Sequence, residues 1–416
     1  MSPTIRERAE RARGAARRLA RLDAGAKDAA LHALARHLRA SAEPIAEANR
    51  RDLEAGQAAG LSVAVLDRLQ MGPAVVEATA AAVEVVARLP DPVGSQREGR
   101  RLANGLLVAR ERVPLGVIAM IYEARPNVTI DAAALCLKAG NAVLLRGGKE
   151  ASQTNSVLGE VLAASLGEVG LPVFAAQVVP AGDRESTREL LGLTGLVDLA
   201  IPRGGEGLVR FVAEHARVPV VQHYHGVCHL YLDAGCDVEM ARALVLNGKV
   251  QRPGVCNALE CLLVHEDAAR EALASIAASL AEHGVEIRGC PRTRELVPAA
   301  VAATGADWGR EFLDLVLAVR VVPSLEAAIE HIERHGSHHT EAICTRDVER
   351  AERFLREVDA SCVLVNASTR FNDGGQLGLG AEIGISTSKL HAYGPMGLES
   401  LTCERFVVRG SGQVRR

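Results

Sequence analysis

Residues 142–155 read Ala-Val-Leu-Leu-Arg-Gly-Gly-Lys-Glu-Ala-Ser-Gln-Thr-Asn, and this stretch decides the fold class. Its first four residues are the apolar run of a short buried strand. Two glycines follow at a turn, and a helical pattern begins at 152 and extends to 168. A strand that passes through a glycine turn into a helix is the repeating unit of an α/β sheet. We therefore predict parallel strands covered by helices.

The same alternation continues along the chain in both directions. Residues 3–90 show helical spacing of apolar residues and are predicted to be mostly helical. From 128 to 248, further strands are predicted at 176–179, 197–201, 218–221 and 229–232, with helices at 184–193, 206–215 and 237–247. From 258 to 366, strands are predicted at 259–264, 315–319, 341–344 and 362–365, with helices at 267–283, 325–334 and 347–357. The two series predict two α/β lobes with Rossmann-like parallel sheets.

Two segments interrupt this alternation with extended structure. Residues 98–121 are predicted to be extended, and Asn104-Gly105 is typical of a two-residue hairpin turn. Residues 113–121 form an apolar run that we interpret as one buried strand. Residues 400–408, after a glycine-rich stretch, predict a last strand.

The composition fits a two-lobed protein and narrows its partners. The chain has 416 residues, a hydrophobic fraction of 48% and a formal net charge of −3. This charge gives no reason to expect nucleic acid or an anionic membrane as a partner. No apolar run approaches the ~20 residues of a membrane span, and the N-terminus lacks a signal-peptide pattern. We expect a cytoplasmic protein.

Cysteine and lysine usage adds two further observations. Nine cysteines occur singly, with no CxxC pair, which indicates reduced thiols. Lysine occurs only at 27, 138, 149, 249 and 389, whereas arginine is abundant. Drift in genomic composition explains this bias; alternatively, the remaining lysines lie where a guanidinium would not fit.

The segment 251–258, Gln-Arg-Pro-Gly-Val-Cys-Asn-Ala, contains the main candidate for catalysis. It lies between the two predicted lobes, where Pro and Gly favour a tight turn that would present Cys256. A thiolate attacks acyl carbon and leaves readily. The cations Lys249 and Arg252 would favour the thiolate. The alternative is a small buried cysteine in a loop.

Three other segments carry polar residues next to strands. Asn127 follows a strand and precedes a helix, so its amide would donate to an oxyanion or else cap the helix. Arg146 and Lys149, beside two glycines, would meet a phosphate. Gly204 and Gly205 occupy a similar position, but neither segment is a GxGxxG fingerprint, and both fit ordinary turns.

Histidines at 223, 225 and 229 would share one side of a strand, which raises the alternative of a metal site. No carboxylate accompanies them at the spacing of metal ligands. We therefore expect no metal site.

Several motifs together resemble the aldehyde dehydrogenase superfamily over nearly the whole chain. They are VPLGVIAMIYEARPNVT (113–129), AVLLRGGKEASQTN (142–155), VQHYHGVCHLYLD (221–233), QRPGVCNALE (251–260), the run 322–343 and the glycine-rich region 374–384. Within the superfamily, the pattern is most similar to the branch that reduces gamma-glutamyl phosphate. The resemblance implies an aldehyde-dehydrogenase-like fold: two α/β lobes and a small β oligomerisation flap.

The resemblance also implies domains and roles. We expect a cofactor-binding domain over 1–99 and 113–248, a catalytic domain over 249–395 and a flap formed by 100–112 and 396–416. Cys256 matches the family nucleophile, and Asn127 the oxyanion-binding residue. The cofactor would meet Arg146, Lys149, Gly204, Gly205 and Glu311, and the substrate would meet Arg252, Arg370, Phe371 and Ser386.

The implied activity is NADPH-dependent reduction of L-glutamyl 5-phosphate to L-glutamate 5-semialdehyde, in proline biosynthesis. Relatives that hydrolyse their thioester carry a Glu where this chain has His223-Tyr224-His225-Gly226-Val227, so water would be poorly activated. A homo-oligomer is implied, with glutamate 5-kinase as a candidate partner. The alternatives are an acylating dehydrogenase for another acyl phosphate or acyl-CoA, or a catalytically silent scaffold.

Overall fold

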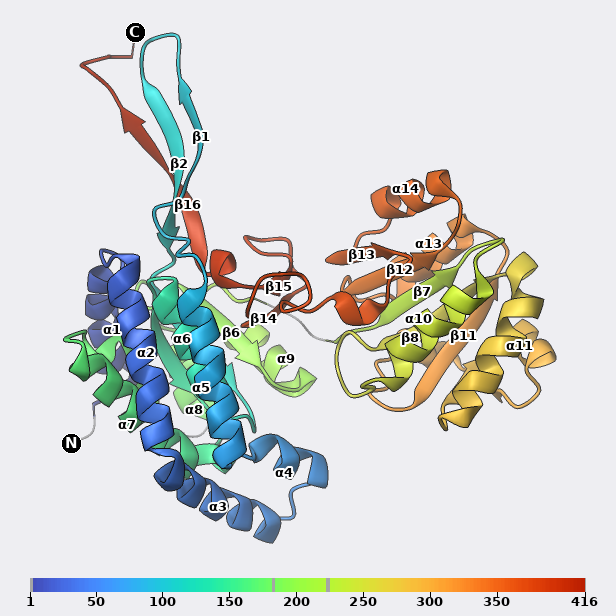
Figure 1. Cartoon of the computed structure of the whole chain (residues 1–416), viewed down its shortest axis with the longest axis horizontal. Coiled ribbons are helices and arrows are strands. Elements are labelled where there is room, and N and C mark those ends of the chain that lie inside the picture. The colour runs from blue at the N-terminus through green and yellow to red at the C-terminus, as the bar shows by residue number, and fades with distance from the viewer. Residues whose placement is uncertain (1–2, 182–183, 222–224, 416) are drawn as a thin grey trace. The chain divides into compact units, whose positions relative to one another are not determined.

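The computed structural model describes residues 3–181, 184–221 and 225–415, and divides the chain into two compact units (Figure 1). The first unit comprises Met1–Gln222, Leu379–Gly384 and Met396–Arg416. The second comprises His223–Gly378 and Ile385–Pro395. The chain passes from one unit to the other four times, and the last two passages fall within the short strands β14 (Gly384–Ser386) and β15 (Gly394–Met396).

A four-stranded parallel sheet forms the centre of the first unit. Its strand order is β5-β4-β3-β6. The strands are β3 (Val117–Tyr122), β4 (Ala142–Arg146), β5 (Ala176–Val178) and β6 (Leu199–Arg203). The helices that follow them are α6 (Asn127–Lys138), α7 (Ser152–Glu168), α8 (Arg184–Leu191) and α9 (Glu206–His215). Every residue of β3 is buried, as expected of a central parallel strand.

Five helices precede this sheet, which confirms the prediction that residues 3–90 are mostly helical. They are α1 (Ile5–Leu19), α2 (Ala24–Ala40), α3 (Ala42–Ala58), α4 (Val63–Leu69) and α5 (Pro73–Arg88). A capping box of Thr4 and Glu7 begins α1. Two lysines are buried among these helices: Lys27 Nζ lies 2.7 Å from Asp91 Oδ2, and Lys138 pairs with Asp28.

Two strand predictions in this unit were wrong in detail. The run 113–121 is broken because Gly116 has a φ of 128° between β2 and β3. The Asp198 carboxylate accepts the Val117 N–H there at 2.8 Å, so the backbone bonds to a side chain. Residues 218–221 do not form a strand. A single parallel β-bridge joins Ala200 and Val220.

The flap is a three-stranded antiparallel sheet that extends from the first unit (Figure 1). Its strands, in the order β1-β2-β16, are β1 (Gln96–Arg101), β2 (Leu107–Pro114) and β16 (Thr402–Arg409). The β1–β2 turn is not the two-residue type. Leu102 N–H donates to Leu106 O at 2.8 Å, and of Asn104 and Gly105 only the glycine has a positive φ, 87°. A three-residue loop with Gly in the left-handed region explains both observations.

The second unit contains a seven-stranded parallel sheet with the order β10-β9-β11-β8-β7-β12-β13. The strands are β7 (Cys228–Leu232), β8 (Leu259–His265), β9 (Glu286–Gly289), β10 (Val301–Ala302), β11 (Val316–Val322), β12 (Thr340–Cys344) and β13 (Cys362–Val365). The helices are α10 (Val238–Val250), α11 (Glu266–Glu282), α12 (Pro291–Leu296), α13 (Leu325–His335) and α14 (Val348–Glu357).

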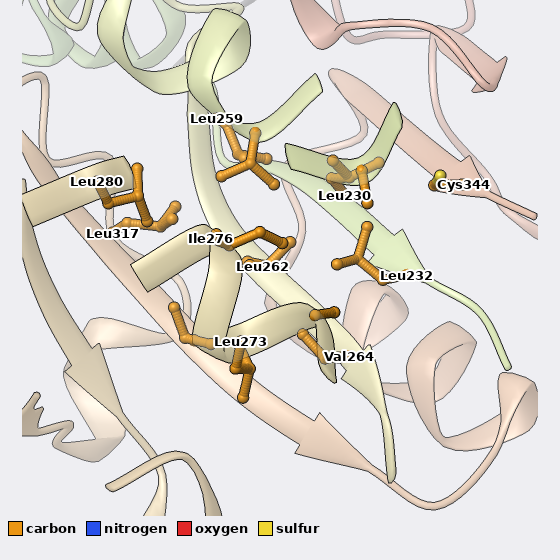
Figure 2. Packing of buried hydrophobic residues seen from close by; sticks show 14 of the residues in the cluster. Leu230, Leu232, Leu259, Leu262, Val264, Leu273, Ile276, Leu280, Leu317 and Cys344 are labelled. Carbon is orange, nitrogen blue, oxygen red and sulfur yellow. The ribbon is translucent and has the colours of Figure 1, made fainter. Parts of the chain in front are cut away.

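Each face of this sheet buries an apolar layer. Figure 2 shows one layer, in which Leu262 and Leu230 of the sheet pack with Ile276 of α11. On the opposite face, Leu263 of β8 belongs to a cluster with Phe354 of α14. The alternation of side chains along each strand supplies both layers.

The predicted boundary at 248/249 differs from the observed division. Strand β7 and helix α10 belong to the second unit, whose sheet places β7 between β8 and β12. The periodicity predicted both elements but gave no information on which sheet they join. The short elements β9, β10 and α12 were not predicted.

Within the described ranges, no single helix is both long and apolar enough to cross a membrane. Only α4 and α5 taken together, bent by 56° to each other, meet that test of length and composition.

Candidate active site

Cys256 lies on a tight turn between α10 and β8 in the second unit. Ala258 N–H donates to Val255 O at 3.0 Å, which places Cys256 and Asn257 at the centre of the turn. The Cys256 side chain is half-buried. The Cys256 backbone carbonyl accepts a hydrogen bond from the Cys228 thiol, with the sulfur and oxygen 3.2 Å apart. Gly226 lies so close to the same carbonyl that a Cβ at this position would overlap it. The segment 226–228 therefore packs on the Cys256 carbonyl.

The Cys256 turn is tied to the segment that carries Arg370. Asn257 Nδ2 donates to Asn372 O at 3.0 Å and to Arg370 O at 3.4 Å. Arg370 Nε donates to Gln251 Oε1 at 3.0 Å. Burial and then the Arg252 guanidinium lower the pKa of Arg370, so the two cations lie near each other. We predict that these two guanidiniums bind an anionic group of the substrate.

Two other substrate candidates differ in accessibility. Phe371 is 47% exposed, whereas Ser386 is buried. The Ser386 hydroxyl donates to Ser388 O at 3.1 Å. Substrate contact therefore remains a prediction for both residues, with Phe371 the more accessible.

Lys249 does not supply the cation that the sequence suggested for the thiolate. Its ammonium Nζ lies 2.7 Å from Glu260 Oε2, and both side chains are 0% exposed. Burial lowers the pKa of Lys249, and the Glu260 carboxylate acts in the opposite direction. Burial raises the pKa of Glu260 to about 7, against the effect of Lys249. The lysine charge is balanced within the core.

Glu311 lies close to the loop that precedes β7. Its Oε1 accepts the Gly226 N–H at 2.9 Å, and its side chain is half-buried. Because Gly226 also packs on the Cys256 carbonyl, Glu311 and the Cys256 turn share one neighbour. The structure therefore brings Cys256, Glu311, Arg252 and Arg370 into one part of the second unit.

Asn127 begins α6 in the first unit. Its Nδ2 donates to Asp131 Oδ2 at 3.0 Å. Burial raises the pKa of Asp131 to about 6, while this hydrogen bond and Arg203 act in the opposite direction. The bond fixes one amide hydrogen of Asn127 and so orients the other. Asp131, one helical turn away, was not predicted from the sequence.

A cavity of about 580 Å³ lies beside β5 and α7. Gly147, directly after β4, lines it, and a Cβ at this position would overlap the Asn155 amide. Arg146 turns back to donate to Gly147 O at 2.8 Å, and Lys149 is exposed. Neither lines the cavity. The cations in its wall are Arg8 and Arg11 of α1, and Glu160 is the acidic member. The sequence gave no signal for these two arginines.

Gly204 and Gly205 precede α9. Gly205 N–H donates to Glu123 Oε2 at 3.0 Å, and a Cβ on Gly204 would overlap that carboxylate. The N-terminus of a helix favours an anion, and here that anion is the Glu123 carboxylate. A phosphate group bound at this helix end would have to displace the Glu123 carboxylate.

The histidine run falls partly outside the described residues, because His223 and Tyr224 are among those left undescribed. His229 is buried, with Nδ1 2.9 Å from Glu341 Oε2. Burial lowers the pKa of His229, but Glu341 and Cys261 raise it to about 10. This carboxylate comes from β12, which is distant in sequence and explains why local spacing missed it.

His229, Cys261 and His331 bring ligand-type atoms within 4.8 Å of one another. The Arg320 guanidinium lies 3.0 Å from His331 Nδ1. A metal ion would have to bind next to this cation. We therefore interpret the group as a hydrogen-bonded core.

Comparison with known proteins identifies the family. The family model described as "Aldehyde dehydrogenase family" matches residues 2–291. This chain belongs to the aldehyde dehydrogenase family. A gamma-glutamyl phosphate reductase of Sorangium cellulosum is 63% identical over 99% of this chain and 97% of its own length. Membership confirms the predicted fold class, and it makes the chain an oxidoreductase that uses a nicotinamide cofactor and a small-molecule substrate.

Solved structures of aldehyde dehydrogenases extend the comparison. The gamma-glutamyl phosphate reductase of Thermotoga maritima has a TM-score of 0.98 at 43% identity, with full coverage of both chains. An acetylating aldehyde dehydrogenase of Geobacillus thermoglucosidasius has a TM-score of 0.67 at 17% identity, covering 99% of this chain and 97% of that one. The second likeness concerns the fold alone.

Proposed function

We propose that this aldehyde dehydrogenase catalyses the NADPH-dependent reduction of L-glutamyl 5-phosphate to L-glutamate 5-semialdehyde and phosphate, the second step of proline biosynthesis. The observation that carries the proposal is the half-buried Cys256 thiol on a fixed turn, with the guanidiniums of Arg252 and Arg370 nearby. The substrate is inferred from the relatives named gamma-glutamyl phosphate reductase.

The first unit fits a dinucleotide phosphate. Gly147 and Asn155 lie together in the cavity wall, where the Asn155 amide leaves no space for a Cβ on Gly147. The N-terminus of α9 already receives the Glu123 carboxylate. Arg8 and Arg11 in the cavity wall favour a cofactor with an additional phosphate, which supports NADPH over NADH. Arg146 and Lys149 are the further candidates for contact with the ribose and phosphate. When bound, the cofactor supplies the hydride that reduces the acyl group.

In the proposed mechanism, the Cys256 thiolate attacks the acyl carbon and phosphate leaves, so that a thioester forms on Cys256. Arg252 and Arg370 hold the phosphate. The Asn127 amide donates to the oxyanion of the tetrahedral intermediate, which develops only during reaction. After reduction, the carbon–sulfur bond breaks, the aldehyde leaves and the thiolate is restored. Release of phosphate in the first step needs no strong acid because an acyl phosphate is already activated.

We place the enzyme in the cytoplasm as a homo-oligomer. All nine cysteines are thiols, which suits a reducing compartment. Strand β16 is an edge strand with Phe406 63% exposed, and a second copy could cover it. Because acyl phosphates hydrolyse readily, glutamate 5-kinase is the candidate partner that supplies the substrate.

The direct test runs the reaction in reverse. Purified protein is mixed with pyrroline-5-carboxylate, NADP and phosphate, and NADPH formation is followed by absorbance. We expect a rate that requires phosphate. Parallel assays replace phosphate with coenzyme A and NADP with NAD. A rate with coenzyme A alone would favour the acylating alternative, and no rate under any condition would reject the proposed function.

A further inference from the structure

Lys249 and Glu260 stand at the two ends of the segment that carries Cys256. Lys249 is the penultimate residue of α10, and Glu260 is the second residue of β8. Their charged atoms lie 2.7 Å apart, and both side chains are 0% exposed. The ion pair therefore joins the two ends of the Cys256 segment inside the protein.

The second oxygen of Glu260 extends this connection toward Glu311. Glu260 Oε1 accepts the Leu313 N–H at 3.2 Å. Leu313 has a φ of 56°, a conformation that is unfavourable for leucine and needs support from its surroundings. A Cβ on Gly254 would lie 3.8 Å from Leu313 O, so the Cys256 segment also approaches this residue. Glu311 lies two residues before Leu313.

Stability alone does not account for a pair of this kind. Removing two charges from water is costly, and apolar residues of similar volume often stabilise a core as well or better. An apolar pair could fill the same volume. It could not accept the Leu313 N–H and bind α10 at the same time. The pair thus provides a fixed geometry that packing does not provide.

We propose that Lys249 and Glu260 are positioning residues, which hold the Cys256 turn at a fixed place relative to Glu311. The proposal rests on the proposed function, since it assigns the pair a purpose in reduction through Cys256. Neither residue needs to touch the substrate. Displacements of about 1 Å in a reacting group can cost about a hundredfold in rate, so a small shift of the turn would be visible in kinetics.

The test compares the single variant Glu260→Leu with the double variant Lys249→Met/Glu260→Leu. The single variant leaves a buried ammonium without its partner and should lower the Tm strongly. The double variant should recover most of the Tm. If the pair positions the turn, the double variant still loses kcat, by about 10- to 100-fold, with KM for pyrroline-5-carboxylate within about threefold of wild type. Hydrogen exchange over 251–258 and 311–315 should also be faster.

A second ion pair with a buried lysine offers a control. Lys27 pairs with Asp91 in the first unit, and Asp91 Oδ1 also accepts a backbone N–H, from Val93 at 2.9 Å. Lys27→Met/Asp91→Leu should change the Tm while kcat stays within about twofold. The control separates the general effect of losing a buried ion pair from an effect on Cys256.

Wild-type kcat together with wild-type exchange rates in the double variant would overturn the proposal, since a structural role predicts that activity returns with the fold. If the double variant does not fold, Glu260→Gln replaces it, with an expected tenfold loss of kcat; unchanged kcat there has the same negative meaning. If wild type itself shows no phosphate-dependent activity, the proposed function fails. The exchange rates then still decide whether the pair holds the turn.

Discussion

The sheets of the two units differ in where they carry ionisable side chains. In the first unit, β3 consists of Val-Ile-Ala-Met-Ile-Tyr and is buried throughout. In the second unit, the adjacent strands β12, β7 and β8 carry the buried ionisable residues Glu341, His229 and Glu260. In the first sheet, the charged residues are confined to the last positions of two strands, Arg146 of β4 and Arg203 of β6. In the second sheet, Glu341 pairs with His229, and Glu260 pairs with Lys249 of α10.

This difference suggests a division of labour. The turns after β4 and β6 lie outside the packed sheet, and the Glu123 carboxylate occupies the N-terminus of α9, where we propose that a cofactor phosphate binds. Buried pairs cannot adjust without a large cost. The nucleophile would therefore depend on precise geometry, and cofactor binding on displaceable contacts. Substitutions in the two units should separate these properties.

The largest effect is expected in the second unit. Cys256→Ala removes the nucleophile, so the rate should fall by at least about ten-thousandfold while the Tm stays near that of wild type. The measurement is phosphate-dependent NADP reduction. Cys403→Ala, which changes an exposed cysteine on the flap, is the control and should keep full activity. Substantial activity in Cys256→Ala would show that the thiol is not the nucleophile.

In the first unit, Asn127→Ala should be the most damaging change. Loss of one hydrogen bond to an oxyanion commonly reduces kcat by about a hundredfold or more. KM should change little because the bond forms in the transition state. Steady-state kinetics of both parameters provide the check, with Asn104→Ala in the flap turn as the control. A rise in KM at constant kcat would instead place Asn127 in substrate binding.

Asp131 provides a test on stability. Its pKa of about 6 in the folded protein lies above the usual value of 3.8, so its ionisation opposes folding. The stability that it contributes is present below about pH 4 and is lost as the pH rises toward 6 and above. The loss amounts to about 3 kcal/mol, given about 1.4 kcal/mol per tenfold change in proton affinity.

Asp131→Asn removes that pH dependence while keeping a hydrogen-bonding side chain. At pH 8 we expect slower hydrogen exchange of the α6 amides than in wild type, and at pH 4 no difference. Equal exchange of the two proteins at pH 8 would show that the carboxylate is not destabilised by burial.

The smallest effect is expected at the displaceable anion site. Glu123→Gln keeps an acceptor for the Gly205 N–H but removes the charge that competes with a phosphate. KM for NADPH should fall by about threefold, an effect of less than 1 kcal/mol, as for a partly exposed charge at a helix N-terminus. Glu189→Gln, an exposed change on α8, is the control. An increased KM would mean that Glu123 assists cofactor binding.

Local sequence patterns predicted most elements but not their assignment to sheets. The run Leu259–Val264 predicted β8 because an apolar run of that length bounded by turns is typical of a buried strand. The strand over 229–232 was predicted equally well but was assigned to the wrong lobe. Strand pairing depends on contacts with β8 and β12, which are remote in sequence. The break at Gly116 was missed for the same reason, since Asp198 stabilises it from 82 positions away along the chain.

The candidate site was predictable where chemistry is local. Cys256 and its turn follow from Pro253, Gly254 and the thiol itself. The partner of Lys249 was not predicted, although Glu260 within an apolar strand was a signal, because a buried carboxylate needs a partner. The roles of Asp131 and Glu123 depend on hydrogen bonds that only the folded backbone defines.

The distribution of lysine has a practical consequence. Three of the five lysines, Lys27, Lys138 and Lys249, are buried at 1% exposure or less, whereas Lys149 and Lys389 are exposed. Reagents that acylate amines should therefore modify the native protein at very few places. Acylation of the three buried lysines requires local unfolding. The rate of acylation at each of these lysines therefore measures how often its surroundings unfold.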